Sequence, residues 1–226
     1  MKLLAIETAT EACSVALGVN GEVIERHQVA PREHTQLVLP MVAELLAEAG
    51  IALGELDALV LGRGPGAFTG LRIAAGVVQG LAFSVDRPVV SVSTLAMLAQ
   101  SAIEAGHPAV IAALDARMGE VYWGAYRADG AGLAATEERE SVSPPAEVQP
   151  PDDEPWTGVG PGFAVYAEVL GNLNGLTVFD DAVLPRARHA LPLAARDLAA
   201  GLAVPAEQAQ PVYLRNRVAQ TLAERG

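Results

Sequence analysis

Two acidic residues in this sequence each stand at the end of a strand-like apolar run. Glu7 closes the first run, Asp115 closes another in the middle of the chain, and a short turn follows each acid. The first turn also carries the hydroxyl groups of Thr8 and Thr10. Carboxylates and hydroxyls at such positions can hold a hydrated metal ion and phosphate oxygens. If the fold brings the two acids to face each other, these four residues predict a nucleotide cleft.

A glycine-rich segment, 62–70, is also suited to anions. Gly64 and Gly66 precede a long helical pattern, and the backbone amides at the start of a helix can receive a phosphate. The segment lacks the Gly-Lys-Ser/Thr ending of a P-loop and the Gly-x-Gly-x-x-Gly spacing of dinucleotide folds. Glycines also permit a tight strand-to-helix turn. The anion-binding and structural interpretations are equally open at this stage.

Groups for catalysis or metal binding are otherwise scarce. The four histidines show neither His-x-x-x-His nor His-Glu-x-x-His spacing, and the sequence contains no Gly-x-Ser-x-Gly elbow. Cys13 is the only cysteine, which excludes an intrachain disulfide and a cysteine-based zinc cluster. The sequence therefore predicts no catalytic residue and no metal site.

The elements that must position these residues alternate between strand and helix patterns, which favours an α/β fold. Asn20-Gly21 is a typical two-residue hairpin turn, so the chain is expected to open as an antiparallel meander. Pro40 lies inside the first helical pattern and predicts a kink or a late helix start. In the first half we expect strands over 2–6, 12–19, 22–29, 56–61 and 89–92, and helices over 34–49, 68–85 and 94–105.

The order of parts begins again after residue 109. The runs 110–114 and 120–126 repeat the strand, acid, turn and strand of the N-terminus, and Gly158–Phe163 echoes the earlier glycine-rich segment. Chance recurrence in an α/β protein is the alternative. The repeat predicts two lobes related by an internal βββαβα-type duplication.

The lobe boundaries follow from this repeat. Residues 1–100 together with 206–226 are expected to form the first lobe, and residues 101–205 the second. The Pro-bounded segment 211–216 is expected to return the chain to the first lobe.

The two long helical patterns, 34–49 and 68–85, are apolar around most of their circumference. A helix on one side of a core needs only one apolar stripe, so both helices are expected to bury two faces. Deep burial within one lobe is the alternative, but we favour contact with another protein or a second copy. The residues expected at that contact are His34, Leu37, Val38, Met41, Leu45, Leu71, Ala75, Val78 and Ala82.

Charge and composition limit the classes of function. The formal net charge is -12, whereas nucleic-acid binding requires Lys and Arg to neutralise phosphates. Any RNA in this protein's pathway should therefore be held by another molecule. The N-terminus shows no signal-peptide pattern, and no apolar stretch is long enough to span a membrane. We expect a cytoplasmic protein.

Four segments together resemble the bacterial TsaB (YeaZ) family over nearly the whole chain. They are Leu4–Ala16, Gly62–Arg72, Leu114–Tyr122 and Pro211–Asn216. The resemblance implies an actin-like ATPase (ASKHA) fold. It also implies a non-catalytic platform protein needed to make threonylcarbamoyladenosine in tRNA, at the adenosine that follows the anticodon.

The resemblance further implies the partners. In the family, TsaB pairs with TsaD, which carries the metal site and transfers threonylcarbamoyl from threonylcarbamoyl-AMP to the adenosine, and the ATPase TsaE joins them. The two long helices are implied to form a four-helix bundle with their counterparts in TsaD, or in a second TsaB as a homodimer. tRNA would be contacted mainly through the complex. No cofactor is required, and weak binding of ATP or ADP in a vestigial cleft stays open.

One segment differs from the TsaD relatives, which carry a paired-histidine metal motif on the first helix. The corresponding stretch here, 32–37, contains only His34. A metal-dependent transferase or peptidase site is therefore not carried over. The alternative function is a stand-alone ATPase or peptidase of the glycoprotease-like superfamily, whose turnover would depend on Glu7 or Asp115.

Overall fold

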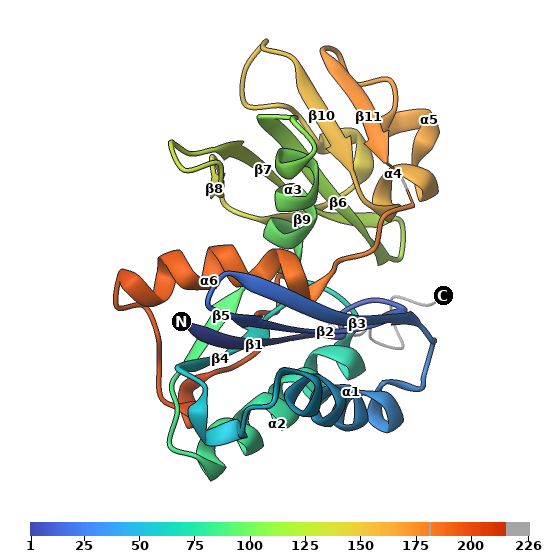
Figure 1. The fold of residues 1–226 in the computed structure, drawn as a ribbon. Helices are drawn as coiled ribbons and strands as arrows, with labels where there is room; N and C mark the ends of the chain where they lie inside the picture. Colours follow the sequence, from blue (N-terminus) through green and yellow to red (C-terminus); the bar gives the residue numbers. More distant parts are fainter. Residues whose placement is uncertain (181, 216–226) are drawn as a thin grey trace.

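A computed structural model describes residues 1–180 and 182–215, which form two lobes built on two mixed sheets (Figure 1). The first sheet has the strand order β3-β2-β1-β4-β5. β1 to β3 form an antiparallel meander, and β4 and β5 continue the sheet parallel to β1. Its strands are β1 (Lys2–Glu7), β2 (Ala12–Val19), β3 (Glu22–Val29), β4 (Ala58–Gly62) and β5 (Val89–Val92).

The second sheet repeats this order, as β8-β7-β6-β10-β11, with β9 paired to β7. β6 to β8 form a meander, and β10 and β11 run parallel to β6. The two sheets share this strand order, but the second half departs from the predicted βββαβα order, because only the 3-10 turn Pro145–Glu147 separates its meander from β10. The strands are β6 (Ala109–Arg117), β7 (Glu120–Ala128), β8 (Ala134–Thr136), β9 (Ser141–Ser143), β10 (Trp156–Val159) and β11 (Leu176–Asp180).

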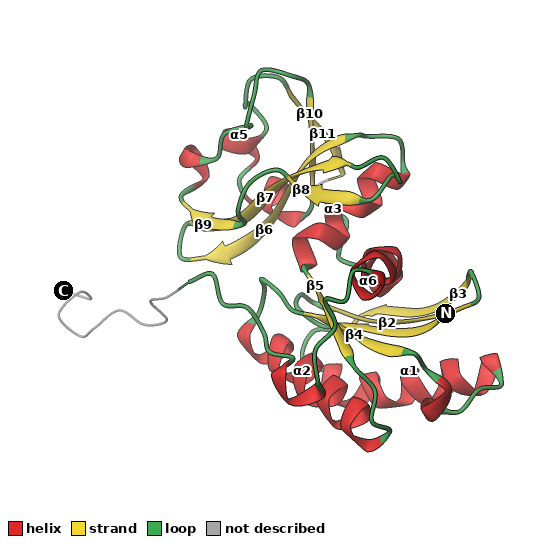
Figure 2. Ribbon diagram, turned by 90° about the vertical axis from the view of Figure 1, so that its left-hand side faces the viewer, coloured by secondary structure: helices red, strands yellow, loops and turns green. Residues whose placement is uncertain are grey.

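Helices cover both faces of the first sheet (Figure 2). α1 (His34–Ala49) and α2 (Phe68–Ser84) lie on its outer face, and α6 (Ala190–Ala199) lies on the face toward the second lobe. The remaining helices are α3 (Thr94–Glu104), α4 (Pro161–Val165) and α5 (Ala167–Leu170), with single 3-10 turns at Leu53–Glu55, Pro145–Glu147, Ala187–His189 and Ala206–Gln208. Among the described residues no helix is long and apolar enough to cross a membrane.

The lobes exchange one helix each. α3 directly follows β5 of the first sheet but packs on β6, β7 and β8 of the second. α6 follows β11 of the second sheet but packs on β1, β4 and β5 of the first. The predicted division, with 1–100 in the first lobe and 101–205 as the second, is therefore wrong for both helices. Residues 94–100 of α3 pack on the second sheet, and the apolar face of α6 completes the core of the first sheet. One buried cluster, to which both helices contribute, spans the two lobes.

A second buried cluster lies between the first sheet and the pair α1 and α2. β1 and β4 are covered on both faces, which explains their nearly continuous apolar sequences. The helices contribute their sheet-facing side to this cluster: Val38, Met41, Val42, Leu45, Ala74, Ala75, Val78 and Ala82. One apolar side of each long helix is therefore satisfied inside the lobe.

The ends of the long helices follow local rules. α1 begins at His34 and continues through Pro40, so the alternative of a late start was wrong. It ends at Gly50, whose φ of 65° is the left-handed conformation that glycine adopts readily after a helix. Ser93 caps α3, and its Oγ accepts a hydrogen bond from the backbone amide of Leu95 at 3.1 Å.

The C-terminal segment returns to the first lobe, as expected from the sequence. Val204 bridges to Val89 at the edge of β5, and the amide of Val212 donates to the carbonyl of Arg63 at 2.8 Å. Residues 216–226, which the first-lobe prediction included, lie outside the described residues.

Candidate functional site

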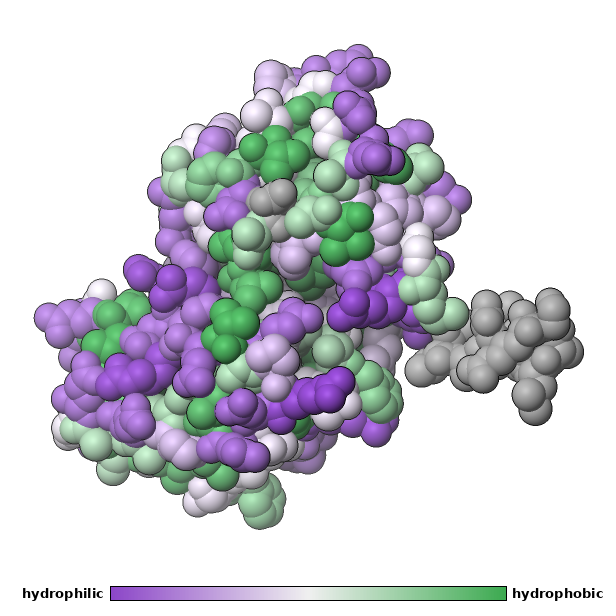
Figure 3. All heavy atoms as spheres, turned by 90° about the vertical axis from the view of Figure 1, so that its right-hand side faces the viewer, coloured by the Kyte–Doolittle hydropathy of each residue, from purple (hydrophilic) through white to green (hydrophobic). Residues whose placement is uncertain are grey.

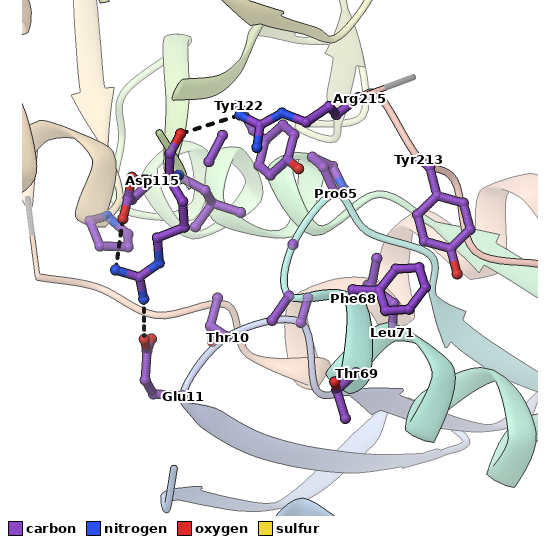
Figure 4. Close-up of a pocket in the computed structure, with 18 of the residues that line it drawn as sticks. Thr10, Glu11, Pro65, Phe68, Thr69, Leu71, Asp115, Tyr122, Tyr213 and Arg215 are labelled. Atoms are coloured by element: carbon purple, nitrogen blue, oxygen red, sulfur yellow. Dashed lines mark hydrogen bonds and ion pairs between the residues drawn. The ribbon is translucent and has the colours of Figure 1, made fainter. Parts of the chain in front are cut away.

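A cleft of about 960 Å³ lies between the lobes, where the β1–β2 turn and the β6–β7 turn approach each other (Figure 4). The start of α1, the β4–α2 loop, α4 and the C-terminal segment form the other walls. Figure 3 views the molecule from this side and shows hydrophobic surface along the junction of the two lobes. The arrangement matches the predicted cleft in place, so each predicted residue can be located relative to it.

Glu7 lies beneath the cleft and does not face it. Its carboxylate accepts hydrogen bonds from the amide of Ala9 at 2.5 Å and from the hydroxyl of Thr94 at 2.8 Å. A Cβ added at Gly62 would meet a Glu7 carboxylate oxygen, so glycine at that position makes room for the acid. Burial raises the pKa of Glu7 to about 7. The prediction that Glu7 faces Asp115 across the cleft was wrong, because both carboxylate oxygens of Glu7 are engaged beneath the cleft by Ala9 and Thr94.

The hydroxylated turn divides into inner and outer residues. Thr8 is buried and its hydroxyl donates to the carbonyl of Gly70 at 2.8 Å, so it fastens the turn to the first turn of α2. Thr10 lines the cleft. Gly66 lines it too, whereas Gly64 is buried behind Leu71. Of these residues only Thr10 and Gly66 reach a ligand-accessible wall.

The structural interpretation of the glycine-rich segment has direct support. A Cβ at Gly66 would lie 2.5 Å from the carbonyl oxygen of Ala9, and a Cβ at Gly70 would clash with the backbone of Thr8. Gly64 has a φ of 94°. Close packing on the β1–β2 turn therefore accounts for Gly66 and Gly70, and left-handed backbone accounts for Gly64.

Asp115 faces the cleft but is held by its own lobe. Its Oδ1 accepts hydrogen bonds from the amide of Arg117 at 2.8 Å and from the hydroxyl of Tyr166 at 3.0 Å, and its Oδ2 lies 3.1 Å from the Arg117 guanidinium. The same guanidinium reaches Glu11 of the first lobe at 3.7 Å. Asp115 therefore orients an arginine that bridges the opening, as the dashed lines of Figure 4 show.

Arg117 was not among the site residues predicted from the sequence. Arg117, Met118 and Gly119 all have positive φ values, of 63°, 56° and 77°, which make the β6–β7 turn very tight. The turn projects Arg117 and Met118 outward, and the Arg117 side chain is 78% exposed. Gly119 was the one residue of the turn whose type indicates left-handed backbone, because arginine and methionine rarely adopt it.

An aromatic cluster at the rim of the cleft was also missed. Phe68 and Tyr213 have ring centroids 5.5 Å apart, and the Arg72 guanidinium lies 3.8 Å from the centroid of the Phe68 ring. Arg72 also donates to the Tyr213 hydroxyl at 3.4 Å. The four-residue spacing of Phe68 and Arg72 on a helix could have predicted their contact, but Tyr213 is distant in sequence.

The residues predicted for partner contact lie almost entirely on the inner side of α1 and α2. Val38, Leu45, Leu71, Val78 and Ala82 are buried under the first sheet or its loops, and so are Met41 and Ala75. His34 is buried as well, with Nε2 3.2 Å from the carbonyl oxygen of Ala12. Because these side chains are buried within the chain itself, the prediction that they contact a partner was wrong. Leu37 alone of the predicted set is only partly buried.

The outer side of the two helices presents a different apolar set. Phe83 is 80% exposed and Leu39 is 50% exposed. Gly76 and Gly80 are exposed on the same helix face, and a Cβ at either would meet no atom within 4 Å among the described residues. We call the exposed surface formed by Leu39, Gly76, Gly80 and Phe83 the outer helix face. The half-buried side chains of α1 and α2 pack against the cluster beneath the helices instead: Leu37, Leu46, Ile73, Val77 and Leu81.

The two sheets of matching strand order, the exchanged helices and the interlobe cleft define a two-lobed protein with the actin-like ATPase (ASKHA) fold. The family described as "TsaD: tRNA N6-adenosine threonylcarbamoyltransferase" matches residues 23–222. The tRNA threonylcarbamoyladenosine biosynthesis protein TsaB of Escherichia coli K12 is 46% identical over 97% of this chain and 96% of its own length. The chain belongs to the TsaB (YeaZ) family.

Further relatives agree with this assignment. The TsaB of Haemophilus influenzae is 41% identical over 96% of this chain and 95% of its own length. The solved structure "YeaZ from Pseudomonas aeruginosa" is 51% identical, covers 94% of this chain and 99% of its own, and superposes with a TM-score of 0.88. Family and fold are thus supported by sequence and by structure.

Proposed function

We propose that this protein is the non-catalytic platform subunit of a cytoplasmic tRNA threonylcarbamoyladenosine complex. In this proposal it binds TsaD through the outer helix face and supports it, together with TsaE, in transferring threonylcarbamoyl to the adenosine that follows the anticodon. When alone, the chain would form a homodimer through the same face. The outer helix face is the observation that carries the proposal.

The chemistry of that face favours a helix partner. Large apolar side chains beside two exposed glycines suit a second helix that approaches closely. Glycine in a helix interior costs roughly 1 kcal/mol relative to alanine. Within the described part of the chain, no neighbouring atom requires the absence of a side chain at Gly76 or Gly80. Contact with another molecule gives both glycines a role.

The cleft supports the platform over a stand-alone ATPase or peptidase. The two carboxylates on which such an enzyme would depend are engaged inside the chain: Glu7 with Ala9 and Thr94, and Asp115 with Tyr166 and Arg117. The net charge of -12 fits contact with tRNA mainly through other subunits.

Association can be tested by charge substitution on the outer helix face. The double variant Leu39→Glu/Phe83→Glu should remain folded, because both side chains are exposed, but should lose TsaD binding by a factor of at least about 100. Light scattering after size exclusion and titration calorimetry with purified TsaD would measure this. Tight TsaD binding by the folded double variant would refute the proposal.

A matched control places the same charge elsewhere. Val169, on α5 of the second lobe, is 40% exposed and does not line the cleft, so Val169→Glu should leave TsaD binding unchanged. Reconstituted tRNA modification should fall with the outer-face variant and not with the control.

A further inference from the structure

The C-terminal segment does more than close the fold of the first lobe. Residues 211–215 run along the mouth of the interlobe cleft, and Val212, Tyr213, Leu214 and Arg215 all line it. Figure 4 shows Tyr213 beside Phe68 of the first lobe and Arg215 on the side of the second-lobe turn. The segment is therefore in contact with both lobes at the place where they part.

Its first anchor is on the first lobe. The amide of Val212 donates to the carbonyl of Arg63 at 2.8 Å, and the Tyr213 ring packs on Phe68. Just before it, the side-chain amide of Gln79 on α2 donates to the carbonyl of Ala209 at 2.8 Å. These contacts fix the backbone of the segment, so residue 215 leaves the first lobe from a defined position.

Its second anchor is the β6–β7 turn of the second lobe. The Arg215 guanidinium donates to the carbonyl of Arg117 at 3.2 Å, forms an ion pair with Glu120 and approaches the sulfur of Met118 at 3.5 Å. The Arg215 side chain is only 19% exposed, which reduces solvent screening of the pair. The Arg215 side chain thus contacts three of the four residues 117–120 of this turn.

Two further ion pairs between the lobes can be compared with that of Arg215: one lies away from the cleft, and the other is longer and more exposed. Arg63 pairs with Glu140 at 3.2 Å, but Glu140 does not line the cleft. The Arg117–Glu11 pair crosses the mouth, yet it is 3.7 Å long with both side chains largely exposed, and such pairs contribute little. Within the described residues, Arg215 makes the most buried ionic contact across the mouth.

We propose that residues 211–215 are a strap that sets the opening of the interlobe cleft, with Arg215 as its fastening residue. Unfastening Arg215 leaves the lobes joined through α3 and α6 while the β6–β7 turn moves away from the first lobe. The cleft then widens at its mouth without loss of either core. This inference does not rest on the proposed partner of the outer helix face.

Paired spin labels can measure the opening in the full chain. Gln36 on α1 and Glu168 on α5 are exposed, so cysteines at these positions report the distance between lobes, whereas Cys13 is buried. Arg215→Ala should shift the distance distribution to longer values and broaden it. Arg215→Lys, which keeps the charge but not the forked donors, should lie between it and the parent.

Hydrogen exchange gives a second readout. Arg215→Ala removes a largely buried, charge-assisted hydrogen bond. This loss should speed hydrogen exchange of the backbone amides in 117–120 by about tenfold. Glu120→Gln removes the same ion pair from the side of the second lobe and should reproduce both effects. It therefore provides the test if Arg215→Ala folds poorly.

Arg127→Ala is the matched control, because Arg127 forms ion pairs with Asp152 and Glu154 within the second lobe. It should leave the interlobe distances unchanged. Parent-like distances in both Arg215→Ala and Glu120→Gln would overturn the strap, and so would an equal opening in Arg127→Ala.

Discussion

Replacing Gly76 and Gly80 by alanine should have opposite effects on the chain alone and on its association. In the free chain a Cβ at either position meets no atom within 4 Å, so the change removes the conformational cost of glycine without a clash. Each substitution should raise the free energy of unfolding by about 1 kcal/mol. For a chain of this size the double variant should melt about 4–8 °C higher.

In the complex the same two methyl groups would lie between closely packed helices. Overpacking of this kind costs about 1–3 kcal/mol, which weakens association by roughly 5-fold to more than 100-fold. Calorimetric melting of the isolated chain and titration with TsaD would give the two values separately. Ser101→Ala on α3 is a control, because it adds helix propensity away from the outer helix face.

Two outcomes would refute this reasoning. A double variant that is more stable but binds TsaD as tightly as the parent would show that no helix approaches these glycines. A double variant that is less stable alone would show that the space around them is already filled in the free chain.

Two further predictions concern buried residues. The raised pKa of Glu7, about 7 against the ordinary glutamate value of 4.5, means that the folded chain holds the Glu7 proton more tightly than the unfolded chain. Its contribution to stability is fully present below the unfolded pKa and is lost as pH rises through 7, by about 2 kcal/mol between about pH 5.5 and pH 8; urea unfolding of Glu7→Gln should lack this decline. Val78→Asp buries a carboxylate with no cationic partner in its cluster and should unfold the chain, seen as lost near-ultraviolet circular dichroism.

The first of these fails if the stability of parent and Glu7→Gln follows the same pH dependence. The second fails if Val78→Asp melts like the parent, which would mean that α2 does not pack on the first sheet through this residue.

Much of the first lobe could be predicted from the sequence. The hairpin turn at Asn20-Gly21, the glycine after α1 and the serine before α3 are local signals, and they gave β2, β3 and α1 with the observed bounds. The recurrence of strand, acid and turn also pointed to the second sheet. Local signals sufficed because each depends on neighbouring residues only.

The side on which a residue lies could not be predicted in the same way. Both faces of α1 and α2 are apolar, so the sequence could not say whether Val78 or Val77 faces the sheet. The inward turn of Glu7 depends on Thr94 and Gly62, and the position of Tyr213 depends on Phe68. These contacts join residues far apart in the chain, which no local pattern reports.

The exchanged helices impose an order on folding during synthesis. The first sheet is complete in sequence at Val92, but the helix that covers its inner face ends at Ala199. At about 5–20 residues per second the ribosome needs on the order of 5–20 s to supply the residues between them. For that interval an apolar sheet face is open to solvent and chaperones, and a fragment ending after α3 should remain aggregation-prone however long it is given to fold.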